Sequence, residues 1–113
     1  MALPMEAPAP AMSPPVVRRH ANADGSVSLL FDCPGCGFLH GPRIAPASAS
    51  PARACWKWNG SLDRPTLTPS LIVRASDPPL VCHSWITGGL IQFLDDCTHR
   101  YAGRTVPLPE IDS

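Results

Sequence analysis

The sequence predicts a mainly β protein: a small antiparallel β domain held together by zinc, with a Cys-Pro-x-Cys-Gly knuckle and one short helical turn. Fifteen prolines and 8 glycines among 113 residues disfavour long helices. Short apolar runs separated by turn residues favour strands. The 5 cysteines are an odd number, which argues against a disulfide framework and favours metal binding.

Composition excludes several functions. The formal net charge is +0, so the chain lacks the electrostatic footprint of a nucleic-acid-binding protein, and we expect neither nucleic acid nor a membrane as partner. No apolar run approaches the roughly 20 residues of a membrane span, which predicts a cytoplasmic protein (the host cytoplasm if phage-encoded). The only glutamates, Glu6 and Glu110, lie far from any histidine, which excludes zincin helices and zinc deaminases.

Two regions are predicted. Residues 1–22 are rich in proline and alanine and are expected to form a disordered leader. Residues 23–113 are expected to form a single zinc-binding β-rich domain, in which residues 42–54 are a surface loop. A domain of this size buries a modest core and benefits from a metal cross-link.

The first predicted strand covers residues 26–31 and runs into the knuckle at 33–37. A short aromatic strand follows at 55–58. It ends at Asn59-Gly60, the strongest two-residue hairpin signature.

Three further strands are predicted at residues 71–74, 80–86 and 90–94. Pro65 and Pro69 precede the first of them and favour an edge or a bulge over a central strand. The other two strands flank Thr87-Gly88-Gly89 and are expected to form a hairpin.

After this hairpin, the sequence predicts a single helical turn. Asp95 or Asp96 can cap a turn that runs through Tyr101 and stops at Gly103. The tail from 106 to 113 is expected to be extended.

The knuckle is the strongest chemical motif of the sequence. Cys33 and Cys36 are three residues apart, which places both thiolates on one side of a tight loop, and Gly37 can take the positive φ that turns backbone N–H groups toward sulfur. A thioredoxin-like redox pair would need a helix here, and Pro34 and Gly35 disfavour one.

Tetrahedral zinc needs further ligands, and the dense supply is Cys82, His83, Cys97 and His99. Alternation along a strand sends Cys82 and His83 to opposite faces, so only one of them can face a given metal. The preferred set is Cys33, Cys36, Cys97 and one of Cys82 or His83. Such a set is typical of a structural site, because it leaves no open position.

Three other residues are weaker metal candidates. His40 follows Cys36 by four residues and is a further possible ligand. His20 lies in the leader, and Cys55 beside Trp56 resembles a core residue.

Several stretches match one known family, in the right order over most of residues 31–109: CPGCGxxH (33–40), WxWNG (56–60), RPTLTPSLIVR (64–74), CHSWITGGLIQFLDDCTH (82–99) and AGRTVPLP (102–109). The chain resembles a family of small domains common in phage and prophage genomes, whose members are often mislabelled ammonia monooxygenase.

The family is related to zinc-dependent peptidases of bacterial ubiquitin-like conjugation operons. These relatives carry a pattern similar to S-H-F-W-I-x-N-G, which shares His83 with this chain. The resemblance implies that His83 is a metal ligand or a catalytic residue. Cys82 stands where the relatives have serine and Leu80 where they have cysteine, which leaves the ligand identities open.

The first functional hypothesis is a zinc hydrolase, with ester or isopeptide bonds of a protein as the substrate implied by the resemblance. Zinc would lower the pKa of a bound water to about 7. Asp96 and His99 are the chosen catalytic residues, and Asp95 or an unligated His83 could also act as general base.

The alternative is a non-catalytic module whose zinc stabilises a small core and which binds a protein partner. Its contact surface would be the edge strand at 65–74 or exposed side chains of Trp56, Trp58 and Trp85. Counting the ligands discriminates the two hypotheses, because a hydrolase needs an open position on zinc.

Overall fold

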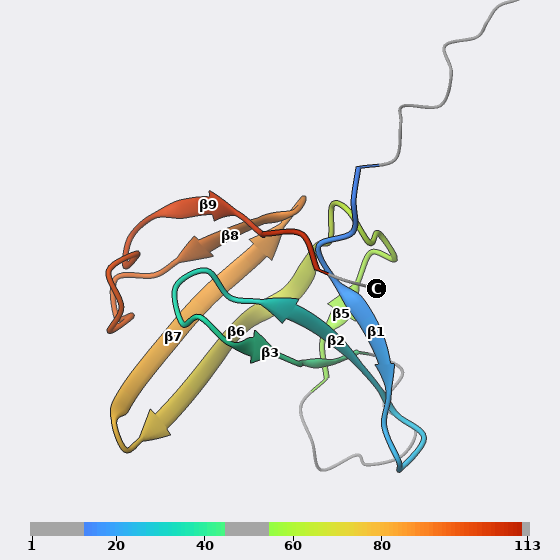
Figure 1. The fold of residues 1–113 in the computed structure, drawn as a ribbon, viewed down its shortest axis with the longest axis horizontal. Coiled ribbons are helices and arrows are strands. Elements are labelled where there is room, and N and C mark those ends of the chain that lie inside the picture. Colours follow the sequence, from blue (N-terminus) through green and yellow to red (C-terminus); the bar gives the residue numbers. More distant parts are fainter. Residues whose placement is uncertain (1–12, 45–54, 112–113) are drawn as a thin grey trace, which may run out of the picture.

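A computed structural model describes residues 13–44 and 55–111, which form two antiparallel β-sheets (Figure 1). The smaller sheet is built around β2 (Val27–Asp32), which pairs with its three other strands: β1 (Arg18–Ala21), β3 (Leu39–His40) and β4 (Arg43–Ile44). The larger sheet has the order β5-β6-β7-β8-β9, with bounds Lys57–Trp58, Leu67–Ser76, Pro79–Thr87, Leu90–Phe93 and Thr105–Pro107. The prediction of a mainly β, antiparallel domain is confirmed.

The core contains inward-facing side chains from both sheets. Leu29 and Phe31 of β2 are completely buried, as are Ile91 and Phe93 of β8 to within one per cent. Because successive side chains of a strand point to opposite faces, the two buried side chains of each strand lie on the same face of their sheet. The knuckle cysteines extend this core at one end, since Cys33 follows β2 directly and is itself buried.

A bulge interrupts the pairing of β6 with β7. Leu67 pairs with Ile86, but the next pair is Leu71 with Ser84, so three residues of β6 lie opposite Trp85 alone. The expectation that the prolines of this segment mark a bulge is confirmed for Pro69. Bulges re-aim side chains beside functional sites, and Ser70 is the last residue of this one.

The predicted helical turn is wrong. Residues 95–103 form turns, and the described part of the chain contains no helix. Thr98 explains why: its backbone N–H donates to the carbonyl of Val81 and its side chain bonds the backbone of the same residue. These bonds to β7 compete with the helical i→i−4 ladder and hold the segment against the sheet. There is consequently no described helix that is long and apolar enough to cross a membrane.

The predicted boundary of the leader at residue 22 is also wrong. Residues 18–21 form β1, which pairs with β2, and Val16 and Val17 before it are buried. Backbone N–H groups of both valines donate to the carbonyl of Leu62, which ties the segment to the body of the protein. The rest of the predicted leader (1–12) and most of the predicted loop (45–54) lie outside the described residues.

The turn between β7 and β8 gives a matched test of the fold. Gly88 and Gly89 both have positive φ, 58° and 86°. A Cβ on Gly88 would meet nothing within 4 Å, whereas one on Gly89 would lie 3.0 Å from the carbonyl oxygen of Asp63 and 3.3 Å from Cα of Arg64. We expect Gly88→Ala to lower the free energy of unfolding by about 1 kcal/mol through backbone strain.

Gly89→Ala should cost roughly 1–3 kcal/mol more, because the backbone around residue 63 must also shift. Urea unfolding monitored by tryptophan fluorescence measures both variants. Equal losses would show that the hairpin is not packed against residues 63 and 64.

Candidate active site and metal centre

Alternation along β7 separates two groups of polar side chains. Cys82 and Ser84 are buried on the inner face of the larger sheet, whereas His83 is partly exposed and Trp85 is exposed on the outer face. The expectation that Cys82 and His83 diverge is therefore confirmed. The inner face carries a candidate metal centre and the outer face a candidate active site.

The candidate metal centre consists of Cys33, Cys36, His40 and Cys82. Their donor atoms all lie within 4.8 Å of one another, and three of the four residues are buried. The knuckle after β2 supplies the first two, β3 supplies His40, and β7 supplies Cys82 from the other sheet. A metal ion held here would therefore cross-link the two sheets.

Electrostatics within this cluster favour a thiolate at Cys33. The Sγ atoms of Cys33 and Cys82 are 3.8 Å apart, and the Cys36 N–H points at Cys33 Sγ from 3.4 Å. The thiol of Cys82, donating to Cys33, lowers the pKa of Cys33 to about 3 and raises that of Cys82. Burial raises the pKa of Cys36 to about 11.

One orphaned atom shows that the cluster suits a cation. Nε2 of His40 is buried and has no hydrogen-bond partner among the described residues. An unpaired buried imidazole nitrogen costs free energy unless something binds it. Three thiols and one imidazole are soft and borderline donors, a set typical of a structural zinc site.

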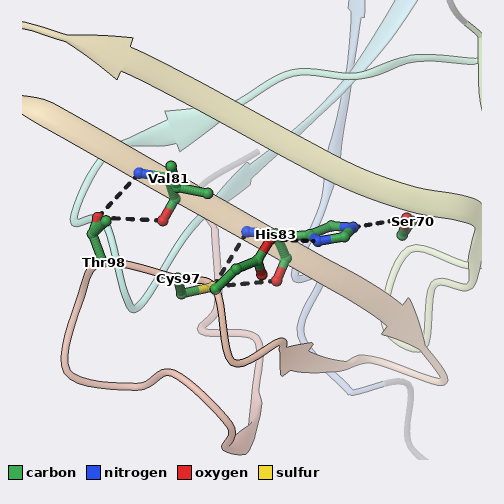
Figure 2. Close-up of polar contacts among 6 residues, drawn as sticks. Ser70, Val81, His83, Cys97 and Thr98 are labelled. Carbon is green, nitrogen blue, oxygen red and sulfur yellow. Dashed lines mark hydrogen bonds and ion pairs between the residues drawn. The ribbon is translucent and has the colours of Figure 1, made fainter.

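Cys97 lies in a second, smaller group with Cys82 and His99. Its Sγ accepts from the backbone N–H of His83 and donates to the carbonyl of the same residue, both at 3.2 Å (Figure 2). In the four-donor cluster, His40 stands where the preferred sequence-based set had Cys97. The sequence analysis had ranked His40, four residues after Cys36, below the other candidates.

On the outer face, Ser70, His83 and Asp96 form a hydrogen-bonded chain. Ser70 Oγ lies 3.1 Å from His83 Nε2, and His83 Nδ1 lies 3.1 Å from Asp96 Oδ2. Figure 2 shows the imidazole of His83 reaching from β7 toward Ser70 on the neighbouring strand. Ser70 is a diagonal neighbour of His83, because Ile72 is directly opposite His83 in the ladder.

The loop after β8 carries Asp96 to this face. It is bound to β7 at two points, since Leu94 N–H donates to the carbonyl of His83 and Thr98 N–H to that of Val81. Thr98 also bonds Val81 through its side chain (Figure 2). Asp96 thus lies midway between Leu94 and Thr98, whose backbones are bound to β7, and this restricts the positions that its carboxylate can take.

A serine, a histidine and an aspartate joined by hydrogen bonds in this order can activate the serine as a nucleophile. When Nδ1–H of His83 donates to Asp96, Nε2 is left to accept the proton of the Ser70 hydroxyl. The side chains of His83 and Asp96 are 26% and 55% exposed, so a substrate can reach them.

The site residues predicted from sequence fall into different groups in the structure. Cys33, Cys36 and Cys82 come together as candidate metal ligands, but His83 does not join them. Asp96, predicted as catalytic, does contact an imidazole, but that of His83 and not of His99.

His99, the other predicted catalytic residue, packs edge-on against Phe93 at 4.5 Å between ring centroids and covers Gly35 of the knuckle. Its Nε2 is buried without a partner among the described residues. It lies beside the metal centre, in the group with Cys82 and Cys97.

Ser70 was missed by the sequence analysis. Serine has no distinctive spacing to a histidine or an aspartate in a β fold, so its place in the sequence did not mark it as a site residue. The available clue was its place in the RPTLTPSLIVR stretch that carried the family resemblance.

On the outer face, a serine is hydrogen-bonded to a histidine that is hydrogen-bonded to an aspartate, which is the arrangement of side chains that serine hydrolases use. The chain belongs to the family described as bacterial ubiquitination-like system serine protease (BubE), whose model matches residues 5–94. No curated protein and no solved structure matches the chain.

The family membership confirms the resemblance to peptidases of ubiquitin-like operons, and its description names a serine protease where we expected a zinc peptidase. Ser70 and His83 lie within the matched residues, whereas Asp96 lies just beyond them. The phage association stays a prediction.

The metal centre yields a test with matched histidines. We expect His40→Ala to weaken zinc binding by roughly 100-fold, since it removes one of four donors. His20→Ala, on the exposed strand β1, should leave it unchanged. Competition with a chromophoric chelator measures the affinity, and elemental analysis the stoichiometry.

A further variant, His99→Ala, distinguishes the two groups of donors. We expect it to retain the metal. Loss of zinc in His99→Ala with retention in His40→Ala would assign the ion to Cys82, Cys97 and His99 instead.

Proposed function

We propose that this protein is a serine peptidase of a bacterial ubiquitination-like system, with Ser70 as nucleophile, His83 as general base and Asp96 as the group that orients His83. The observation that carries the proposal is the pair of 3.1 Å hydrogen bonds that join the three side chains. Membership in a family of serine proteases supports the same chemistry.

The first half-reaction is acyl transfer to the enzyme. Ser70 Oγ attacks the carbonyl carbon of the scissile bond, and its proton passes to Nε2 of His83. Asp96 stabilises the resulting imidazolium through Nδ1–H. His83 then gives the proton to the leaving nitrogen, the carbon–nitrogen bond breaks, and the amine leaves while the acyl group stays on Ser70.

The second half-reaction restores the enzyme. Water takes the place of the amine, His83 removes one of its protons, and the hydroxide attacks the acyl carbon. Collapse of the intermediate returns the proton to Ser70 Oγ and releases a carboxylic acid. The net reaction is hydrolysis of one amide bond, with the peptide or isopeptide bond of a protein as substrate.

In this proposal the metal is structural zinc. Cys33, Cys36, His40 and Cys82 would hold it with four protein donors, and zinc so bound cross-links the two sheets and has no open position for water. This favours the serine route over the zinc-activated water of our first hypothesis. Cys82 and His83 are adjacent on β7, so the cross-link also fixes the strand that presents the base.

The serine route predicts covalent labelling at one residue. A fluorophosphonate should modify Ser70 in the zinc-loaded protein, as located by mass spectrometry of its peptides. Ser70→Ala should lose both the label and the hydrolysis of p-nitrophenyl acetate, down to the residual rate of a site without its nucleophile, while keeping its zinc and its unfolding midpoint. Hydrolysis that survives in Ser70→Ala but disappears on chelation would assign the chemistry to zinc.

Two adjacent aspartates provide a matched test of the orienting group. We expect Asp96→Asn to lower kcat by about 10³–10⁴-fold, because asparagine cannot hold His83 in the productive tautomer or stabilise its imidazolium. Asp95→Asn, the neighbouring exposed carboxylate, should change kcat less than about threefold. Equal effects of the two variants would remove Asp96 from the active site.

A further inference from the structure

The edge of β6 beside Ser70 has backbone groups without partners among the described residues. β5 pairs with β6 only at Leu67 and Thr68. Further along β6, Ile72 is opposite His83 and Arg74 is opposite Val81. The carbonyls of His83 and Val81, however, point away from β6 and accept from the N–H groups of Leu94 and Thr98.

In an antiparallel ladder, two directly opposed residues either bond each other or both point away. The N–H and C=O groups of Ile72 and Arg74 therefore point out of the sheet, at its open edge. No described residue bonds them there. Such an edge is a ready template for an added strand.

An apolar groove runs along the same edge on the inner side. It has a volume of about 530 Å³ and lies between Leu71 and Val73 of β6 and the segment 38–43, whose Phe38 and Leu39 are exposed. Trp56 lines its end next to the nucleophile, where its Nε1–H donates to the carbonyl of Ser70 at 3.2 Å. This bond occupies the edge at Ser70, so the free groups begin at Ile72.

We infer that an extended segment of the substrate, on the N-terminal side of the scissile bond, adds to this edge of β6 as an antiparallel strand. The inference rests on the proposed function and names how that site recognises its substrate. β6 runs away from Ser70 toward Ser76, so a strand antiparallel to it runs toward Ser70 and brings its C-terminal carbonyl to the nucleophile. The backbone supplies affinity and alternate side chains supply specificity.

The register follows from the faces of β6. Substrate residues opposite Leu71 and Val73 point into the groove and should be apolar, because these two side chains face inward. The residue opposite Ile72 faces outward to solvent. The residue opposite Arg74 should be acidic, since Arg74 is exposed and has no acidic partner among the described residues.

A peptide phosphonate tests this register directly on the zinc-loaded protein. The acetylated sequence Glu-Val-Ser-Val-Ala, with a diphenyl phosphonate in place of the C-terminal carboxyl, should label Ser70 at least about tenfold faster than the acetyl-alanine phosphonate alone. N-methylation of its serine, which removes the amide that meets Ile72, should abolish the advantage. N-methylation of the valine next to alanine, whose amide faces away from β6, should retain it.

Two leucines of equal exposure serve as matched protein variants. Leu39 lines the groove and Leu90 lies on β8 away from it, and each is 46% exposed. Leu39→Asp should reduce the ratio of peptide to acetyl-alanine labelling rates by about tenfold, whereas Leu90→Asp should leave both rates unchanged.

The outcomes separate the inference from the proposed function. Equal labelling by the long and short phosphonates, or equal effects of the two N-methyl groups, overturns strand addition while Ser70 remains the nucleophile. Failure of the small fluorophosphonate to label Ser70 overturns the proposed function and the inference with it.

Discussion

The structure depends on the contact between Cys33 and Cys82, whose sulfur atoms lie 3.8 Å apart and connect the knuckle after β2 to β7 of the larger sheet. A domain with so few long elements buries only a modest apolar core, and Leu29, Phe31, Ile91 and Phe93 make up much of it. The cysteine cluster continues that core at its open end. A bound cation would replace the proton that the Cys82 thiol directs at Cys33. It would also provide a partner for Nε2 of His40, which has none among the described residues.

The contact on the inner face affects the outer face because successive side chains of β7 point to opposite faces. Cys82 and His83 are adjacent in the chain. A contact that holds Cys82 on the inner face therefore also holds the backbone of His83, whose side chain projects from the outer face. Cys97 adds a second link, because its sulfur bonds the backbone of His83 and its neighbour in the chain is Asp96. The proposed base and its orienting group are thus each one residue away from a cysteine. The candidate metal centre and the proposed active site therefore both use β7 but have no side chain in common.

Much of the fold could be predicted from local pattern. The strands at 27–32, 79–87 and 90–93, the hairpin at Gly88-Gly89 and the bulge at Pro69 all follow from side-chain period and turn chemistry. The helical turn failed because Thr98 bonds Val81, a residue 17 positions earlier, and no local propensity records that competition. The leader boundary failed for the same reason: the burial of Val16 and Val17 comes from pairing with distant residues.

The sequence by itself determined the residue types of both sites. The knuckle at Cys33 and Cys36 is a local motif, and the divergence of Cys82 and His83 is a property of any strand. Only the tertiary structure decided which residues meet. His40 joined the cysteines because β3 pairs with β2, and Ser70 reached His83 because the β6 bulge sets their diagonal register. The sequence states each side chain directly. The register between two strands depends instead on how they pair, and the order of the strands in the chain does not specify that pairing.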